Sequence, residues 1–380
     1  MLDFIVSLPH YFGSFLVVLT LLVFVHEFGH FWVARRCGVR VEVFSIGFGP
    51  ELFGLTDRHG TRWKLSLLPL GGYVRMFGES NLAATSEGTS APMSAQDQAA
   101  TFHGKSVWRR AAVVVAGPTA NFIFAVLLLS GLNLGYGQLV SAPVVSAVDP
   151  LSAAAAAGIL PGDRIVSLNG QAVDRFEDIA NAVQLGLDAP LTIIVDRNGT
   201  TVTMSAVPRV VEEVDLFGNR HRIGRLGIRS TGETQLIRHG PVGALSAAVE
   251  ETYRISAGTL QAIGQMVVGT RSAEEVGGII RIAKMSGDVA GEGLAAMLIF
   301  AAILSINLGL INLFPVPMLD GGHLVYYVIE AVRGRPLGWR AQEWGFRIGV
   351  ALVASLFLFA TRNDLKSFPV VADFFRRLFT

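Results

Sequence analysis

The hydrophobic residues of the chain are concentrated in four long apolar runs, which polar segments separate. The runs lie at about residues 11–34, 111–134, 294–319 and 341–362. The first three are longer than the roughly 20 residues that a helix needs to cross a hydrocarbon core about 30 Å thick. The fourth is shorter between its charges, and it can span only if its helix begins near Ala341 and Arg347 reaches toward the interface. We therefore predict a multi-pass α-helical membrane protein with about four transmembrane helices.

The composition supports this fold class and excludes several others. Only 16% of the 380 residues are charged, whereas a soluble domain usually has about 25%. The 31 basic and 30 acidic residues leave a net charge of +1, which offers nucleic acid no strongly basic surface. A hydrophobic fraction of 51% excludes a disordered chain. The single cysteine excludes an internal disulfide framework.

Basic residues predict the orientation of the chain in the membrane. No lysine or arginine precedes Arg35, so we expect the first run to be a retained helix and not a cleaved signal peptide. The basic residues that flank the runs fall on one side, which the positive-inside rule makes cytoplasmic. They are Arg35, Arg36, Arg40, Lys105, Arg109, Arg110, Arg333, Arg335 and Arg340, whereas Arg376 and Arg377 in the tail argue weakly the other way. The long segment between the second and third runs is then expected outside the cytoplasm.

The first apolar run contains three ionisable residues in the pattern His-Glu-x-x-His. His26 and His30 are four residues apart, so their imidazoles project from one face of a helix and can bind one zinc ion. Glu27 is placed to take a proton from a water molecule that zinc has made more acidic. In a soluble helix this pattern is only a hint, but ionisable groups within a membrane span are costly and usually functional. We therefore predict a catalytic zinc site.

The third apolar run ends in a segment that supplies a third candidate ligand. Pro315 and Pro317 break a helix, and the two glycines after Asp320 permit a sharp turn. Broken backbone at membrane depth is tolerated where it is buried in protein or lines a wet cavity. Asp320 is therefore a candidate to complete a His₂Asp site with one open position. The alternative is an aspartate that caps a helix at the interface. His323 is expected near the site but not as a ligand.

Several motifs together resemble the site-2 protease family of intramembrane zinc metalloproteases, and its bacterial RseP-like branch in particular. The histidine motif and the segment Asn312–Gly322, which reads N-x-x-P-x-P-x-L-D-G-G, carry this resemblance. It extends to Gly47-Phe48-Gly49-Pro50, Pro69-Leu70-Gly71-Gly72-Tyr73-Val74, Gly117-Pro118-x-x-Asn121 and Leu304-Ser305-Ile306-Asn307-Leu308. Most of the chain is covered.

The resemblance implies a function and a set of site residues. His26, His30 and Asp320 match the zinc ligands of this family, and Glu27 matches its catalytic base. Substrate contacts are expected from Asn312, Pro315, Pro317, Gly47 and Gly49. The implied reaction is regulated intramembrane proteolysis, in which the transmembrane segment of a single-pass protein, such as an anti-sigma factor, is cleaved after a first extracytoplasmic cut. The implied location is the inner (cytoplasmic) membrane of a bacterium.

Residues 41–105 are expected to form a β-hairpin and a loop on the cytoplasmic side. Short β segments at Val41–Phe44 and Arg62–Leu67 are separated by Gly-containing turns. The resemblance implies that this hairpin is associated with the membrane, where a sheet edge could hold an unwound substrate strand by backbone pairing. An ordinary hairpin packed on the helices is the alternative. Residues 81–100, rich in Ala and Ser, are expected to be a flexible surface loop.

The segment 137–210 has the composition of a soluble α+β domain. Its stretch Ala157–Gly170 is similar to the core motif of PDZ domains, of which only one copy is visible. Asp163 and Asn169 are expected to shape turns and not to act in catalysis. The other expected elements are a helix over Phe176–Leu187 and strands over Leu191–Val195 and Thr200–Ala206 around Asn198-Gly199. Such a domain would bind peptide termini or extracytoplasmic segments of substrates by strand addition.

Residues 211–292 are expected to be a linker with an amphipathic helix over Gly240–Gly269. Apolar residues recur there at helical spacing, while Glu250, Glu251 and Arg254 exclude a membrane span. We expect this helix at the outer membrane interface, with a simple stem toward the third run as the alternative. The predicted organisation is an N-terminal membrane part (1–136), the PDZ domain, this linker and a C-terminal membrane part (293–380).

Two other functions fit parts of the sequence. The chain could be a catalytically inactive scaffold that captures peptides through its PDZ domain, but a scaffold has no need of Glu27. It could be a metal transporter, but transport needs ligands along a path, and His10, His59, His103, His221 and His239 are scattered outside the apolar runs. We therefore favour a protease with one Zn²⁺ as cofactor, and with membrane lipid and single-pass membrane proteins as partners.

Overall fold

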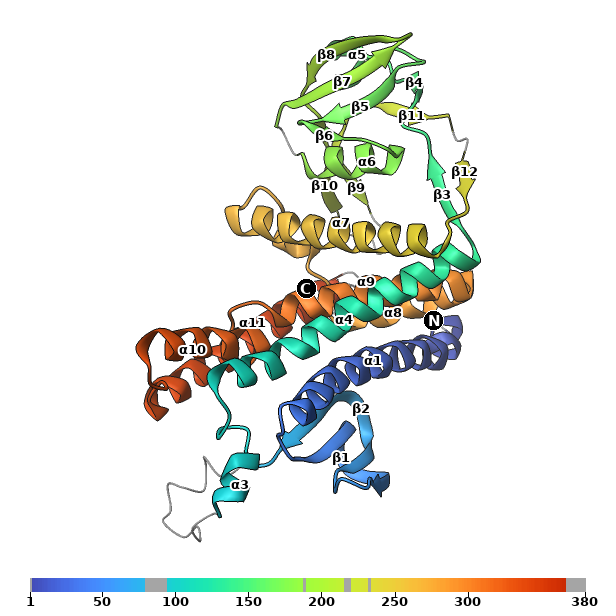
Figure 1. Cartoon of the computed structure of the whole chain (residues 1–380). Coiled ribbons are helices and arrows are strands. Elements are labelled where there is room, and N and C mark those ends of the chain that lie inside the picture. The colour runs from blue at the N-terminus through green and yellow to red at the C-terminus, as the bar shows by residue number, and fades with distance from the viewer. Residues whose placement is uncertain (1, 79–93, 187–188, 215–219, 232–233, 367–380) are drawn as a thin grey trace, which may run out of the picture. The chain divides into compact units, whose positions relative to one another are not determined.

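A computed structural model describes residues 2–78, 94–186, 189–214, 220–231 and 234–366 (Figure 1). Most of the loop predicted at 81–100 lies outside these residues, and so does the tail after residue 366. The chain divides into two compact units. The first comprises Met1–Leu129 and Ile279–Phe359, and the second comprises Ser130–Gly278 and Ala360–Thr380. Each unit is therefore built from two segments that are far apart in the sequence. The division predicted from the sequence instead places the parts of the protein one after another along the chain.

Among the described residues, four helices are long and apolar enough to cross a membrane. They are α1 (Leu2–Arg36), α4 (Val107–Gly135), α9 (Leu294–Asn312) and α11 (Trp339–Lys366). Each corresponds to one predicted apolar run. Val17, Ile123 and Leu358 on these helices are more than half exposed, at 68%, 55% and 66%. Lipid can cover such surfaces at no cost, whereas water cannot.

The third apolar run differs from the prediction at its C-terminal end. α9 ends at Asn312 and not near residue 319, because Pro315 and Pro317 lack the N–H groups that would continue the helix. Met318 in the following loop has a φ of 94°, a conformation that residues with a side chain rarely adopt. Two shorter helices flank α9, and the hydrophobic pattern predicts neither: α8 (Ile279–Glu292) and α10 (Asp320–Arg333).

β1 (Val41–Thr56) and β2 (Arg62–Met76) form an antiparallel two-stranded sheet beside α1 (Figure 1). The strands are longer than predicted, and repeated register shifts bend the sheet. Phe31, Phe44 and Trp63 pack its base on α1, with the ring centroids of Phe44 and Trp63 4.4 Å apart. Its other end exposes Phe48, Leu52, Phe53, Leu67 and Leu68.

The C-terminal end of the segment predicted to be a loop, residues 81–100, forms a short helix, α3 (Ala95–Ala100). The hydroxyl of Ser94 accepts a hydrogen bond from the backbone N–H of Asp97 and so caps the first turn. Alanine is the residue most favourable to a helix, and the composition that suggested a loop therefore also suits a short helix.

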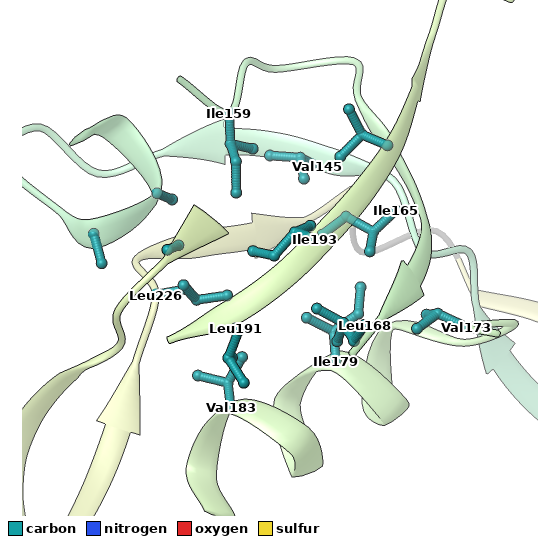
Figure 2. Packing of buried hydrophobic residues seen from close by; sticks show 14 residues of the cluster. Val145, Ile159, Ile165, Leu168, Val173, Ile179, Val183, Leu191, Ile193 and Leu226 are labelled. Atoms are coloured by element: carbon teal, nitrogen blue, oxygen red, sulfur yellow. The ribbon is translucent and has the colours of Figure 1, made fainter. Parts of the chain in front are cut away.

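The second unit contains a four-stranded sheet with the order β6-β5-β7-β8. Its strands are β5 (Arg164–Leu168), β6 (Gln171–Ala172), β7 (Leu191–Arg197) and β8 (Thr200–Ala206), and its short helices are α5 (Ala153–Ala157) and α6 (Phe176–Leu185). Apolar side chains from these elements form one core, in which Ile165 and Ile193 are fully buried (Figure 2). Burial of this cluster is the main stabilising contribution to the sheet.

The polar residues that the sequence assigns to turns of this unit shape turns here. Asp163 accepts a backbone hydrogen bond of 2.9 Å within its turn and forms an ion pair of 2.7 Å with Arg197. Asn169 accepts a backbone hydrogen bond of 2.9 Å from the neighbouring strand. Asn198 and Gly199 have φ values of 52° and 84°, which a two-residue turn between β7 and β8 requires.

The strands of the second unit continue past residue 210, where the sequence predicted a linker. β9 (Arg209–Val214) pairs with β10 (Arg220–Arg225), β11 (Ile228–Ser230) with β4 (Val145–Val148), and β12 (Thr234–Ile237) with β3 (Gln138–Ser141). The predicted boundary is too early, because β3 and β4 at the start of the unit find their partners only after it. Such long-range pairing leaves no local pattern in the sequence.

α7 (Pro241–Val268) occupies the segment predicted to be an amphipathic helix. Val242, Tyr253 and Val267 on it are 83%, 73% and 83% exposed. Ion pairs attach it to α6 and to the residue that precedes α6: Arg254 lies 2.5 Å from Asp178, and Glu251 lies 2.9 Å from Arg175.

Candidate metal centre

Three ionisable side chains from two helices converge in the first unit. His26 and His30 lie one turn apart on α1, and Asp320 is the first residue of α10. The Nε2 atoms of the histidines are 3.2 Å apart, and Asp320 Oδ2 lies 3.2 Å from His26 Nε2 and 3.4 Å from His30 Nε2. The side chains of His26, His30 and Asp320 are only 11%, 11% and 17% exposed. The two motifs that the sequence analysis singled out thus form one largely buried cluster.

α4 supports the two imidazole rings and supplies no candidate ligand itself. The backbone carbonyl of Val113 lies 2.8 Å from His30 Nδ1, and the side-chain nitrogen of Asn121 lies 3.1 Å from His26 Nδ1. Gly117 lies between them in the sequence, and a Cβ there would overlap His30 Nε2. Residues spaced by four share one helix face. Val113, Gly117 and Asn121 therefore form a strip of α4 against which both rings pack.

The tight backbone around the loop after α9 positions Asp320. A Cβ at Gly321 would overlap the backbone carbonyl oxygen of Leu313, so α10 begins packed directly against this loop. α11 approaches the same loop, because a Cβ at Gly349 would overlap the carbonyl oxygen of Pro317. Only glycine permits backbones to come this close. The aspartate is thus held by a loop that is enclosed from two sides.

Glu27 follows His26 on α1, and β2 passes beside it. A Cβ at Gly72 of β2 would lie 3.2 Å from Glu27 Cγ and 2.9 Å from Val23 Cγ1. Glu27 is partly buried, as His26 and Asp320 are. The arrangement therefore brings together a carboxylate that can accept a proton, a strand of the hairpin and the ligand cluster.

The three candidate ligands fit a zinc ion in chemistry and in spacing. Zinc binds imidazole nitrogen and carboxylate oxygen at about 2.0–2.2 Å in tetrahedral sites, which puts the ligand atoms roughly 3.3 Å apart. The separations of 3.2, 3.2 and 3.4 Å agree with this value. Asp320 Oδ2 is buried without a hydrogen-bond partner in the described part of the chain, and a cation would satisfy it. Three protein ligands leave a fourth position open, as in catalytic zinc sites.

Comparison with known proteins identifies the family. Residues 14–356 match the sequence profile of peptidase family M50. The chain belongs to this family. The family membership inferred from the motifs is thereby confirmed.

This M50 peptidase resembles bacterial relatives over nearly its whole length. It is 47% identical to "Putative zinc metalloprotease Atu1380" of Agrobacterium fabrum over 95% of this chain and 97% of the relative. It is 46% identical to "Putative zinc metalloprotease R01501" of Rhizobium meliloti, with coverages of 95% and 97%. It is 38% identical to "Metalloprotease MmpA" of Caulobacter vibrioides, with coverages of 97% and 98%.

The residues predicted to contact substrate in this M50 peptidase lie in two places. Asn312 ends α9, and Pro315 and Pro317 lie in the loop that leads to Asp320. Gly47 and Gly49 lie in β1, where both have a φ of 88°. Gly47 is buried against the backbone of β2, whereas Gly49 faces open space. The role of all five residues in substrate binding stays a prediction.

Two supporting residues were given no role by the sequence analysis. Asn121 belongs to the motif Gly-Pro-x-x-Asn. It follows Gly117 by four residues inside an apolar run, and this spacing indicates that the two residues lie on the same face of a helix. Val113 acts through its backbone carbonyl, which no residue type reveals. His323 lies one turn after Asp320 on α10 and is not part of the ligand cluster within the described residues.

Proposed function

We propose that this M50 peptidase is a zinc-dependent intramembrane endopeptidase that cleaves the transmembrane segments of single-pass membrane proteins. His26, His30 and Asp320 would hold one Zn²⁺, and Glu27 would be the catalytic base. The observation that carries this proposal is the convergence of three ligand atoms within 4.8 Å of one another, in a largely buried site to which a candidate membrane span contributes two. Ionisable groups in such a place are costly unless they bind an ion or one another.

The protein residues have separate tasks in this reaction. Zinc, when bound, polarises the scissile carbonyl and lowers the pKa of water toward about 7. Glu27 takes a proton from the attacking water and then delivers it to the leaving amine. The position of Glu27 next to His26 on α1 and beside Gly72 of β2 supports this task, because the carboxylate has to reach both water and the substrate. The hydrogen bonds that the Nδ1 atoms of the histidines make, with the carbonyl of Val113 and the side chain of Asn121, keep their rings in place.

A transmembrane substrate has to be unwound at the cleavage site, because the peptide bonds of a helix are screened by their own hydrogen bonds. The hairpin beside Glu27 would hold the unwound strand by backbone pairing. The exposed apolar residues at its far end, such as Phe53 and Leu52 at 66% and 62%, support a membrane location for it. Gly47 and Gly49 on the hairpin, and Asn312, Pro315 and Pro317 near Asp320, would contact the substrate.

The second unit would act as a single PDZ domain on the extracytoplasmic side of the bacterial inner membrane. A groove of about 420 Å³ lies between α6 and residues 223–229. PDZ domains bind extended peptides along a helix of this kind. The groove would take a peptide terminus or an extracytoplasmic segment of a substrate, such as an anti-sigma factor already shortened by another protease. Zinc, lipid and these proteins are the partners that we propose.

Replacement of the base and of one ligand tests the proposal. Glu27→Gln in the full chain should retain zinc and cleave a reporter membrane helix about 10²–10⁴-fold more slowly than the wild type. His26→Ala should lose both zinc and cleavage. His59→Ala serves as the control, because His59 is an exposed histidine in the hairpin turn. Cleavage by Glu27→Gln as fast as by the wild type would contradict the role of Glu27 as the base, and full zinc occupancy in His26→Ala would contradict the ligand assignment. A scaffold or a transporter would be indicated if the wild type itself did not cleave the reporter.

A further inference from the structure

We propose that Asn121 is a positioning residue of the metal centre: its side-chain carbonyl accepts a hydrogen bond from His26 Nδ1–H, which leaves His26 Nε2 free to bind zinc. The inference rests on the proposed function and extends it to a residue of α4 that is not a ligand. The two nitrogens of each histidine ring have different neighbours in this site.

The Nε2 atoms of both histidines face the common point of the cluster. They lie 3.2 Å from each other, and Asp320 Oδ2 is 3.2 Å and 3.4 Å away from them. A neutral imidazole carries its proton on one nitrogen only, and the other nitrogen has the lone pair that binds a metal. Both rings therefore need the proton on Nδ1 when their Nε2 atoms bind zinc.

The surroundings of His30 enforce this form. Its Nδ1 lies 2.8 Å from the backbone carbonyl oxygen of Val113, a group that can only accept a hydrogen bond. His30 Nδ1 therefore carries the proton, and His30 Nε2 presents its lone pair to the cluster. A backbone carbonyl cannot be exchanged for a donor, so the tautomer of His30 is fixed by α4.

The corresponding neighbour of His26 is a side chain that can act in either way. Asn121 Nδ2 lies 3.1 Å from His26 Nδ1, while Asn121 Oδ1 is buried without a hydrogen-bond partner among the described residues. With the nitrogen toward the ring, His26 Nδ1 has to accept, and the proton is displaced to Nε2, where zinc should bind. A turn of the amide by 180° exchanges its nitrogen and oxygen at almost the same positions. Oδ1 then accepts from Nδ1–H, so the turn gives this oxygen a partner and frees His26 Nε2. The amide nitrogen moves to the position that Oδ1 leaves.

Asn121 is held firmly enough for this task. The residue is fully buried, and its backbone carbonyl accepts a hydrogen bond of 2.8 Å from the hydroxyl of Ser305 on α9. An acceptor behind a metal-binding histidine fixes the ring and strengthens the ligand, and its loss typically weakens metal binding by about 10–100-fold. α4 therefore orients both zinc-binding rings, one through a backbone carbonyl and the other through a side-chain carbonyl.

Two substitutions with opposite expectations test the inference. Asn121→Leu keeps a similar volume and removes the acceptor, so its zinc dissociation constant, from chelator competition with the purified full chain, should rise about 10–100-fold. Asn121→Asp retains an acceptor and should stay within about threefold of the wild type, as expected when the outer hydrogen bond is preserved. A role in packing alone predicts the reverse order, because leucine fills the site and a buried carboxylate is costly there.

Asn121→Ala serves as a second variant without an acceptor if Asn121→Leu does not fold, which thermal unfolding of the metal-free proteins would show. Ser130→Ala is the matched control, since Ser130 is a buried polar residue of the same helix.

If the wild type binds zinc through His26 but Asn121→Leu or Asn121→Ala binds it equally well, this inference is wrong and the proposed function stands. If the wild type binds no zinc, the proposed function itself is wrong. Tighter binding by Asn121→Leu than by Asn121→Asp would also overturn the inference.

Discussion

Gly117 of α4 lies directly against the ring of His30, so that a Cβ at this position would overlap His30 Nε2 and lie 2.9 Å from His26 Cε1. The absence of a side chain there lets the backbone of α4 reach the histidine pair. This close approach also brings the carbonyl of Val113 to His30 Nδ1. The glycine is therefore part of what fixes both rings, although it binds nothing itself.

We expect Gly117→Ala to weaken zinc binding by about 10–100-fold, the range typical for disturbed support of metal ligands. The methyl group would displace both rings, while alanine favours a helix over glycine by about 0.5–1 kcal/mol. Overpacking of this kind costs about 1–3 kcal/mol, which exceeds the helix gain, so the metal-free protein should unfold at a somewhat lower temperature. Gly131→Ala is the control on the same helix, because a Cβ at Gly131 meets nothing within 4 Å. Unchanged zinc affinity in Gly117→Ala would refute the role given to this contact.

The convergence of His26, His30 and Asp320 could be predicted from the sequence because these residues carry their chemistry in their side chains. His26, His30 and Asp320 stand out as ionisable groups in or beside apolar runs. The turn at Asn198-Gly199 was equally visible, since few residues accept the positive φ values found there. The end of α9 was misplaced by the continuous apolar composition up to Leu319, although the prolines marked the break.

Other parts of the structure could not be read from the sequence for a physical reason. The pairing of β12 with β3 joins segments almost a hundred residues apart along the chain, and alternation within a strand does not name its partner. The support of His30 by Val113 depends on a backbone carbonyl that every residue type provides. Contacts made by the backbone therefore appear only once the helices are placed against one another.

The position of Asp320 should depend on α11 through Gly349. A Cβ at Gly349 would overlap the carbonyl oxygen of Pro317, so Gly349→Ala has to displace the loop that leads to Asp320. We expect a loss of zinc affinity of about 10-fold. This loss is smaller than the roughly 10²-fold loss of reaction rate that misplacing a reacting group by about 1 Å can cause. Gly338→Ala is the control, because that position is open.

A double variant separates this effect from general damage. If Gly349 acts through Asp320, adding Gly349→Ala to Asp320→Ala should cause no further loss of zinc affinity, since effects that share one contact are not additive. Fully additive losses would show that Gly349 influences the site by another route.

Gly72 of β2 should affect turnover and leave zinc binding intact. A Cβ there would lie 2.8 Å from the carbonyl oxygen of Ser45 and 3.2 Å from Glu27 Cγ, so Gly72→Ala has to shift the strand or the glutamate. The three atoms nearest to such a Cβ belong to Ser45, Val23 and Glu27, and none belongs to a candidate ligand. We expect kcat for a reporter helix to fall about 10–100-fold, as misplacement of a reacting group does, with an unchanged zinc dissociation constant. Gly13→Ala on α1 is the control with open space. Loss of zinc from Gly72→Ala would contradict this division of tasks.

The second unit should lose stability in acid through Asp163. Its buried carboxylate accepts two hydrogen bonds of 2.7 Å from Arg197, which lower the pKa of Asp163 below its usual value. The unfolded chain has the ordinary pKa of about 3.9. The contribution of Asp163 to stability is therefore fully present above that pH and decreases as the pH falls through the lowered pKa.

Hydrogen exchange of the full chain, corrected for intrinsic rates, measures this effect in β5 and β7, which carry or flank the pair. Asp163→Asn should increase exchange in these strands at pH 7, because the ion pair with Arg197 is lost. In the wild type, exchange should increase further as the pH falls from 5 to 3. Asp163→Asn should show little of this further increase, because the amide does not titrate. Asp149→Asn is the control, since the Asp149–Arg229 pair lies at the surface with side chains 41% and 71% exposed. Exposed pairs contribute little, so this variant should retain the acid sensitivity of the wild type. The same acid response in Asp163→Asn as in the wild type would assign the pH dependence to other carboxylates of the unit.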